Sequence, residues 1–209
     1  MMTRVGTIVI GLALGAGCTS GPPPPVDSRP YAEAIEASRL EKDAFFLLGA
    51  ESPLLPEDQT GFAGLPYYPI DTAMRVPAVL TEQPLETPVI IELPTSAREM
   101  RRMRKVGTLG FTLGDASLRL TAFTDENDRS MARLFVPFGD LTSGTETYGG
   151  GRYLELDRTP TGLYDLDFNR AYHPYCVYNI SYVCPVPPRE NRLAVAIRAG
   201  ERLPAPDLR

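Results

Sequence analysis

The stretch 106–124, which reads VGTLGFTLGDASLRLTAFT, decides the fold class of this chain. Two runs rich in apolar and β-branched residues, 106–113 and 118–124, flank the dipeptide Gly114-Asp115. Such a dipeptide between two strand-like runs is typical of a tight hairpin turn. The stretch therefore predicts a pair of antiparallel strands at the centre of the chain.

The same strand signature recurs on both sides of this hairpin. Further strands are predicted at 74–80, 88–93, 133–137, 152–157, 163–167 and 193–198, whereas the apolar spacing at 31–48 predicts a helix. About eight short strands and no βαβ alternation disfavour a Rossmann-type fold. The fold class expected is mainly β, an antiparallel β-sandwich or small barrel with an N-terminal α-helix and long ordered loops.

The first residues resemble a bacterial export signal. Arg4 precedes an uncharged apolar run, 5–17, which is shorter than the roughly 20 residues that span a bilayer. The small residues before Cys18 resemble the lipobox of bacterial lipoproteins, although Gly15 stands where that motif usually has Leu. A lipidated Cys18 is therefore predicted, and a plain secretory signal or an uncleaved anchor are the alternatives.

This reading divides the chain into four segments. Residues 1–17 are a predicted signal peptide, 18–30 a Pro-rich tether, 31–203 a single β-rich domain and 204–209 a C-terminal tail. More than one acyl chain on Cys18 gives firm membrane attachment. The expected location is the cell envelope, at the outer membrane facing the periplasm or at the cell surface.

Composition limits the partners that the chain can take. The 209 residues carry a formal net charge of −5 with a pI near 5.0, and they include one His and no Trp. A nucleic-acid partner is not expected, because phosphate binding needs a basic surface. The expected partners are the membrane, through the lipid anchor, and a glycan or small polar ligand. No cofactor is predicted.

Three separated segments carry a long motif: FGDLTSGTETYGGGRYL, DFNRAYHPYCVY and CPVPPRENRL followed by AGE. They begin at Phe138, Asp167 and Cys184. With these segments the chain resembles the bacterial and archaeal family called domain of unknown function 1684, and the resemblance covers almost all of the expected domain. One departure is His173, where the family pattern usually has Asn. The resemblance implies no established activity.

Two cysteines, Cys176 and Cys184, remain once Cys18 is lipidated. An oxidising compartment and their close spacing favour a disulfide. Free thiols are one alternative. A metal site that adds His173 and Asp167 as ligands is another, but the spacing matches no common zinc motif, and no metal is predicted.

The glycine-rich stretch 148–152 ends in an arginine. Its backbone amides and Arg152 can form an anion site. It lacks the Lys-Ser/Thr of a phosphate-binding loop, and it leads into a strand. The structural alternative is a tight turn in which Arg152 bonds to Asp140 or Asp167.

These observations give three functional hypotheses. The leading one is a non-catalytic envelope domain that binds a small polar ligand or glycan. Its candidate ligand-binding residues are Asp140, Tyr148, Arg152, Asp167, Asn169, Tyr172 and Asn191. A second hypothesis is a hydrolase acting on envelope glycans, with acid and base among Asp140, Glu146, Asp167 and Glu190. A third is a structural partner of another envelope protein.

Overall fold

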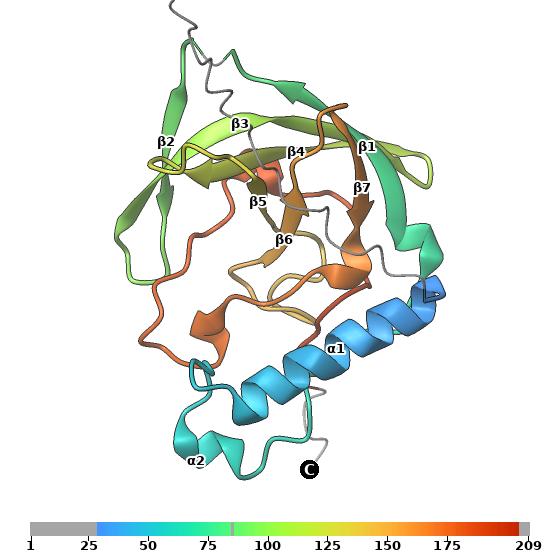
Figure 1. The fold of residues 1–209 in the computed structure, drawn as a ribbon, viewed down its shortest axis with the longest axis vertical. Helices are drawn as coiled ribbons and strands as arrows, with labels where there is room; N and C mark the ends of the chain where they lie inside the picture. Colours follow the sequence, from blue (N-terminus) through green and yellow to red (C-terminus); the bar gives the residue numbers. More distant parts are fainter. Residues whose placement is uncertain (1–28, 85, 205–209) are drawn as a thin grey trace, which may run out of the picture.

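The computed structural model describes residues 29–84 and 86–204 and shows a seven-stranded antiparallel sheet curled almost into a barrel (Figure 1). The strands follow the order β6-β5-β4-β3-β1-β7, and β2 pairs with β3 beside this path. Their bounds are Arg75–Glu82 (β1), Val89–Pro94 (β2), Met100–Leu113 (β3), Ala116–Asp125 (β4), Arg133–Phe138 (β5), Arg152–Asp157 (β6) and Leu163–Asp167 (β7). The mainly β prediction, with its barrel alternative, is confirmed.

The predicted central hairpin is the longest pairing in the sheet. Strands β3 and β4 align Phe111 with Leu118 and Leu109 with Leu120. Gly114 takes a φ of 57° in the turn, a conformation that glycine adopts without steric cost. The register shifts between Lys105 and Gly107, which marks a β-bulge of the kind that helps a sheet to curl.

Side-chain alternation sorts the sheet into an inner and an outer face. The inner residues form one large core that includes Leu109, Leu120, Leu134, Val136, Leu154 and Leu166. On the outer face Leu93, Met103 and Phe123 form a second, small cluster with Phe135 packed against it. Because successive residues of a strand point to opposite faces, the outer cluster gives the sheet a second apolar surface.

The helix α1 (Tyr31–Leu48) has the predicted bounds and lies across one end of the barrel (Figure 1). It buries Ile35 and Phe46. Two polar contacts hold the helix against the rest of the domain: the hydroxyl of Tyr31 donates to Asp167, and the amine of Lys42 pairs with Glu201. The shorter helices are α2 (Pro56–Gln59), η1 (Thr72–Met74), η2 (Phe168–Arg170), η3 (Tyr175–Val177) and η4 (Arg189–Asn191). Within the described residues, no helix combines the length and the apolar character that crossing a membrane requires.

The predicted strand at 193–198 is wrong, because this segment has no ladder partner and runs as irregular chain. Its apolar residues Leu193 and Ile197 are buried in the main core, and this burial produced the strand-like pattern. The main-chain groups bond elsewhere: Leu193 N–H donates to Gly139, and the carbonyl of Ile197 accepts from the side chain of Arg152.

The sheet stays open between β6 and β7. These two strands follow each other in the chain, yet no ladder joins them. A single bridge between Tyr153 and Tyr172 covers one end of the β6 edge. Between β6 and β7 lies a cavity of about 300 Å³, and Tyr31, Arg75 and Asp165 are among its lining residues.

Candidate functional site

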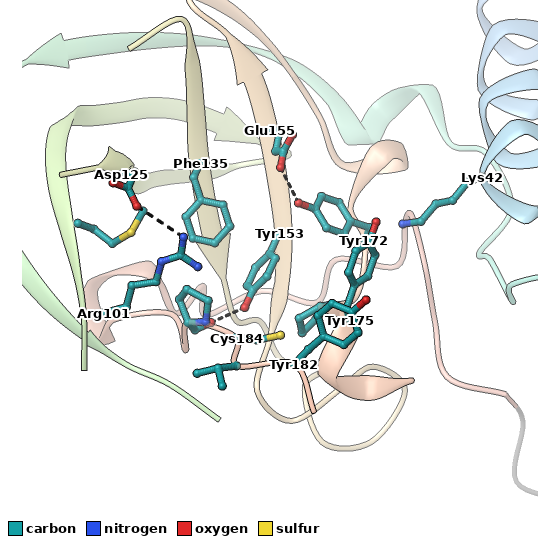
Figure 2. A pocket seen from close by; sticks show the side chains of 14 residues that line it. Lys42, Arg101, Asp125, Phe135, Tyr153, Glu155, Tyr172, Tyr175, Tyr182 and Cys184 are labelled. Carbon is teal, nitrogen blue, oxygen red and sulfur yellow. Dashed lines mark hydrogen bonds and ion pairs between the residues drawn. The ribbon is translucent and has the colours of Figure 1, made fainter. Parts of the chain in front are cut away.

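A cavity of about 510 Å³ lies on the outer face of β3 to β6, under the loop that follows Ala171. We call it the tyrosine cleft (Figure 2). Its lining comprises Lys42, Arg101, Met103, Asp125, Phe135, Tyr153, Glu155, Tyr172, Pro174, Tyr175, Tyr182, Val183, Cys184 and Pro185. Five of these fourteen lining residues are aromatic: Phe135, Tyr153, Tyr172, Tyr175 and Tyr182.

The aromatic rings of the cleft pack edge to face. Tyr153 contacts Phe135 and Tyr172, with ring centroids 4.7 and 5.7 Å apart, and Tyr175 contacts Tyr182 at 5.3 Å. The hydroxyl of Tyr153 donates to the carbonyl of Pro185, which ties the covering loop to β6. The rings therefore form a connected wall that is fixed from the sheet side and from the loop side.

Charged groups stand at the ends and rim of this wall. Figure 2 shows Lys42 and Arg101 at opposite ends of the cleft, with the tyrosines between them. The Lys42 amine lies 4.5 Å from the ring centroid of Tyr172, and Arg101 pairs with Asp125 at 3.6 Å. Glu155 accepts a hydrogen bond of 2.9 Å from the hydroxyl of Tyr172. The cleft thus offers flat apolar faces together with a few polar groups of both signs.

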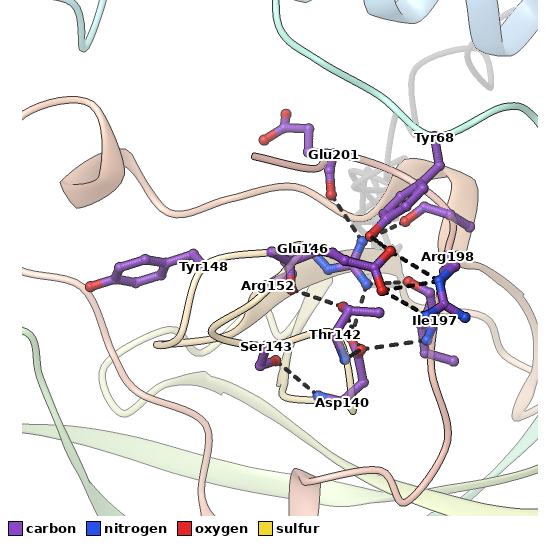
Figure 3. A network of polar contacts seen from close by, with 12 residues as sticks. Tyr68, Asp140, Thr142, Ser143, Glu146, Tyr148, Arg152, Ile197, Arg198 and Glu201 are labelled. Carbon is purple, nitrogen blue, oxygen red and sulfur yellow. Dashed lines mark hydrogen bonds and ion pairs between the residues drawn. The ribbon is translucent and has the colours of Figure 1, made fainter. Parts of the chain in front are cut away.

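Arg152 lies inside the molecule, and the arginine is 1% exposed. Its guanidinium donates to the carboxylate of Asp140 at 2.9 Å and to the carbonyls of Ile197, Ala199 and Glu201 (Figure 3). This matches the structural alternative for the glycine-rich turn. Gly151 makes the turn with a φ of 88°, where an added Cβ would meet the carbonyl of Phe138 at 2.5 Å.

Asp140 is fully engaged by the same network. One of its oxygens accepts from the main-chain N–H and the hydroxyl of Thr142, at 2.7 and 2.6 Å, and the other accepts from Arg152. The charges of the pair compensate each other in an interior that would otherwise penalise them. The pair therefore holds the 139–151 loop against the C-terminal segment, and neither residue lines the tyrosine cleft.

Asp167 and Asn169 form a separate cluster at the start of α1. Asp167 accepts from the hydroxyl of Tyr31 at 2.9 Å and from the main-chain N–H of Asn169 at 3.0 Å. The Asn169 amide bonds to both main-chain groups of Asp71. Burial and the Asp167 carboxylate raise the pKa of Tyr31 to about 12. No hydrogen bond joins this cluster to the guanidinium of Arg152 within the described residues.

The other two candidate residues also have structural partners. The Asn191 side chain accepts from the N–H of Thr121 and donates to the carbonyls of Thr121 and Pro137, where β4 and β5 diverge. Tyr148 points away from the Arg152 network in Figure 3, and burial together with the nearby Cys176 raises its pKa. Of the seven candidate ligand-binding residues, Tyr172 alone lines the tyrosine cleft.

His173 and Glu201 are buried side by side beneath the loop. Glu201 accepts from the main-chain N–H of His173 at 2.7 Å, from Lys42 and from the hydroxyl of Tyr178 at 3.0 Å. His173 accepts a hydrogen bond from the N–H of Tyr148 at its Nε2 atom. Burial, with Arg152 and Lys42 nearby, lowers the pKa of His173 to about 3, so the imidazole is neutral and serves as an acceptor.

The two cysteines meet at the floor of the covering loop. Both are thiols in this structure, and the sulfur of Cys184 accepts from the main-chain N–H of Cys176 at 3.3 Å. Burial raises the pKa of the Cys184 thiol to about 12. The disulfide stays a prediction. Among the described residues there is no group of three or more His, Cys, Asp or Glu side chains that could hold a metal ion.

Sequence reasoning missed the cleft residues that β3, β4 and β5 contribute. Arg101, Asp125 and Phe135 come from the ends and outer face of β3, β4 and β5, far from the long motif. One signal was available: Phe135 and Tyr153 stand at outward positions of strands whose neighbours are buried. Large aromatic residues at such positions indicate a second apolar surface.

One comparison with known proteins identifies the family. A family model described as "Protein of unknown function (DUF1684)" matches residues 60–202. The solution NMR structure of an uncharacterised protein from Haloarcula marismortui is similar over 82% of this chain and 93% of that chain, with 42% identity and a TM-score of 0.64. No curated protein matches. The family match spans well over half of the chain and confirms the resemblance seen in the long motif, so the chain belongs to the DUF1684 family of proteins of unknown function.

Proposed function

We propose that this protein is a non-catalytic binding module of the cell envelope, and that its tyrosine cleft takes a small polar ligand or glycan. The observation that carries the proposal is the wall of four tyrosines between Lys42 and Arg101. Sugar rings have apolar faces that stack on aromatic side chains, and their hydroxyls need a few oriented polar groups.

The size of the cleft supports this class of ligand. Its volume of about 510 Å³ falls within the roughly 300–1,000 Å³ of small-molecule sites. Tyr172 and Glu155 already bond to each other, and the Tyr172 ring is backed by the Lys42 amine. Because these groups hold one another in place, little side-chain entropy is lost when a ligand binds.

A hydrolase is less well supported, because three of the four suggested acids and bases, Asp140, Glu146 and Asp167, are held by other side chains. Asp140 is paired with Arg152 inside the molecule, and Asp167 fastens Tyr31. Hydrogen bonds from Arg198 lower the pKa of Glu146, which is the opposite of what a general acid needs. The carboxylates that do line the cleft, Asp125 and Glu155, each have an arginine as ion-pair partner.

The membrane anchor and the location form part of the proposal. Cys18 and residues 18–28 of the Pro-rich tether lie outside the described residues, and their roles rest on the sequence. A diacylated Cys18 would place the domain at the outer membrane, facing the periplasm or the cell surface. Mass spectrometry of the mature protein tests this: we expect an N-terminal lipid-modified cysteine, and Cys18→Ser should release the protein from the membrane fraction.

The binding proposal is tested by calorimetric titration with a panel of neutral and acidic oligosaccharides, selected by thermal shift. Tyr182→Ala removes one ring of the wall and should weaken binding about tenfold, which is about 1.4 kcal/mol. Phe45→Ala is the matched control, since Phe45 is a partly exposed ring on α1 outside the cleft. No binding by any sugar, or equal losses in both variants, would count against the cleft as a glycan site.

A further inference from the structure

A second cavity lies between α1 and the segment that follows β7. It has a volume of about 170 Å³, and its charged lining residues are Arg39, Lys42, Arg170 and Glu201, with Tyr67 beside them. We call it the Arg39 cavity. Lys42 and Tyr172 line both this cavity and the tyrosine cleft, so the two spaces lie on either side of this pair.

Two side chains of the Arg39 cavity have unused hydrogen-bonding atoms. The guanidinium of Arg39 donates from Nη1 to the carbonyl of Tyr68, but its Nε and Nη2 atoms are buried and have no partner among the described residues. The hydroxyl of Tyr67 is buried and equally without a partner there. A buried donor left unpaired costs about 1–3 kcal/mol, so native structures seldom contain several of them together.

The charge of the lining favours an anion. Three cationic side chains face one carboxylate, that of Glu201, and Lys42 already compensates this carboxylate. Arg170 lies 3.4 Å from Asp167, whereas Arg39 has no ion-pair partner among the described residues. The Arg39 carbon Cζ stacks 4.4 Å from the ring centroid of Tyr67, which fixes the plane of the guanidinium. Burial lowers the pKa of Arg39, because removal from water destabilises the charged guanidinium. An adjacent anion would stabilise that charge.

We propose that the Arg39 cavity binds a small oxyanion, a carboxylate or a phosphate group, with the free edge of the Arg39 guanidinium and the Tyr67 hydroxyl as donors. A guanidinium presents two parallel N–H groups that match two oxygens of such an anion. The cavity is smaller than the roughly 300 Å³ at which sites for larger organic ligands begin, which limits the ligand to a small ion or one acidic substituent. This site is independent of the glycan proposal, since its two proposed donor residues, Arg39 and Tyr67, do not line the tyrosine cleft.

The test is titration of the purified full-length chain with inorganic phosphate and, separately, with acetate, followed by calorimetry and two-dimensional NMR. We expect saturable binding of at least one anion, with the largest chemical-shift changes at Arg39, Tyr67 and Arg170. Binding by acetate alone identifies a carboxylate ligand, and binding by phosphate alone identifies a phosphate ligand.

Three substitutions at the site and one control substitution make the test specific. Arg39→Gln should lower the affinity at least about tenfold, and Arg39→Lys should lower it as well because the two-pronged donor is lost. Tyr67→Phe keeps the ring and should cost about threefold by removing one donor, so it serves if the Arg39 variants fold poorly. Arg198→Gln, an exposed arginine paired with Glu146, is the control and should bind like wild type. The proposal is overturned if neither anion binds, or if the control loses as much affinity as the Arg39 and Tyr67 variants.

Discussion

Arg152 and Tyr153 are neighbours in the chain and face opposite sides of β6. Arg152 points inward, where every bond of its network is to a group of the protein itself, whereas Tyr153 points outward into the wall of the tyrosine cleft. The polar segment around Arg152 is therefore structural, because its side chains hold the interior together. The surface suited to a ligand combines aromatic residues of the same long motif, Tyr153, Tyr172 and Tyr175, with residues from β3, β4 and β5.

The largest effect on stability is expected from a substitution at Arg152. Arg152→Met leaves the Asp140 charge and three carbonyls without their donor in the interior, and breaking a buried ion pair typically costs about 3–5 kcal/mol. We expect a loss of this size in the free energy of unfolding, measured with urea. The exposed Arg198→Met should leave it unchanged within error. A stable Arg152→Met variant would show that the network does not hold the fold.

The same interior region should respond to pH through His173, the only histidine of the chain. Its pKa falls from 6.5 in the unfolded chain to about 3 in the folded protein, so the unfolded state binds the extra proton between these values. Stability is therefore complete above pH 6.5 and declines as the pH falls, by about 1.4 kcal/mol per unit and about 2 kcal/mol in total at pH 5.

Urea unfolding at a series of pH values, from above neutrality down to pH 5, measures this decline. His173→Asn, the residue that the family pattern usually carries, should flatten the curve over that window. An unchanged slope in the variant would assign the pH dependence to other groups.

On the cleft side, the next test concerns Cys176 and Cys184. If the mature protein is exported, oxidation should join them with loss of two electrons and two protons to a disulfide oxidant. Closing this short loop should stabilise the fold by about 2–3 kcal/mol at most. Alkylation followed by mass spectrometry counts the free thiols, and unfolding with and without a reductant measures the effect. Two alkylated thiols in protein purified from the envelope would refute the disulfide.

The smallest effect on stability is expected where the effect on binding is largest. Tyr182 is half-buried on the covering loop, and its ring contacts Tyr175. Tyr182→Ala should lower the free energy of unfolding by only about 1 kcal/mol, the central value for single substitutions. Unfolding and ligand titration on the same sample separate the two roles. A loss of stability as large as that of Arg152→Met would remove the contrast between the two faces of β6.

Local patterns predicted most of the fold. The helix at 31–48 and the strands at 152–157 and 163–167 agree with the structure to the residue, because their periodicity and flanking turn residues are local signals. The failure at 193–198 has a physical reason. A buried irregular segment needs the same apolar residues as a strand, and only the partners of its main chain distinguish the two.

The site was harder to predict, because it depends on which strands become neighbours. Phe135 and Tyr153 come into contact as diagonal neighbours only through the pairing of β5 with β6, and Lys42 is brought to the cleft by α1. Asp167 and Asn169 illustrate the converse. Their residue types suggested a binding site. Instead, Asp167 accepts a hydrogen bond from Tyr31 at the start of α1, and the Asn169 amide bonds to the main chain of Asp71.

The opening between β6 and β7 leaves two strand edges that could recruit strands from other molecules. Two exposed carboxylates lie on these strands: the Asp157 side chain is 88% exposed and that of Asp165 is 54% exposed. The hydroxyl of Thr159 donates a hydrogen bond to the carbonyl of Leu163. Charges at a free edge oppose the addition of a foreign strand. These charges therefore disfavour pairing of the open edges with another strand, and replacing both aspartates with valine should increase aggregation.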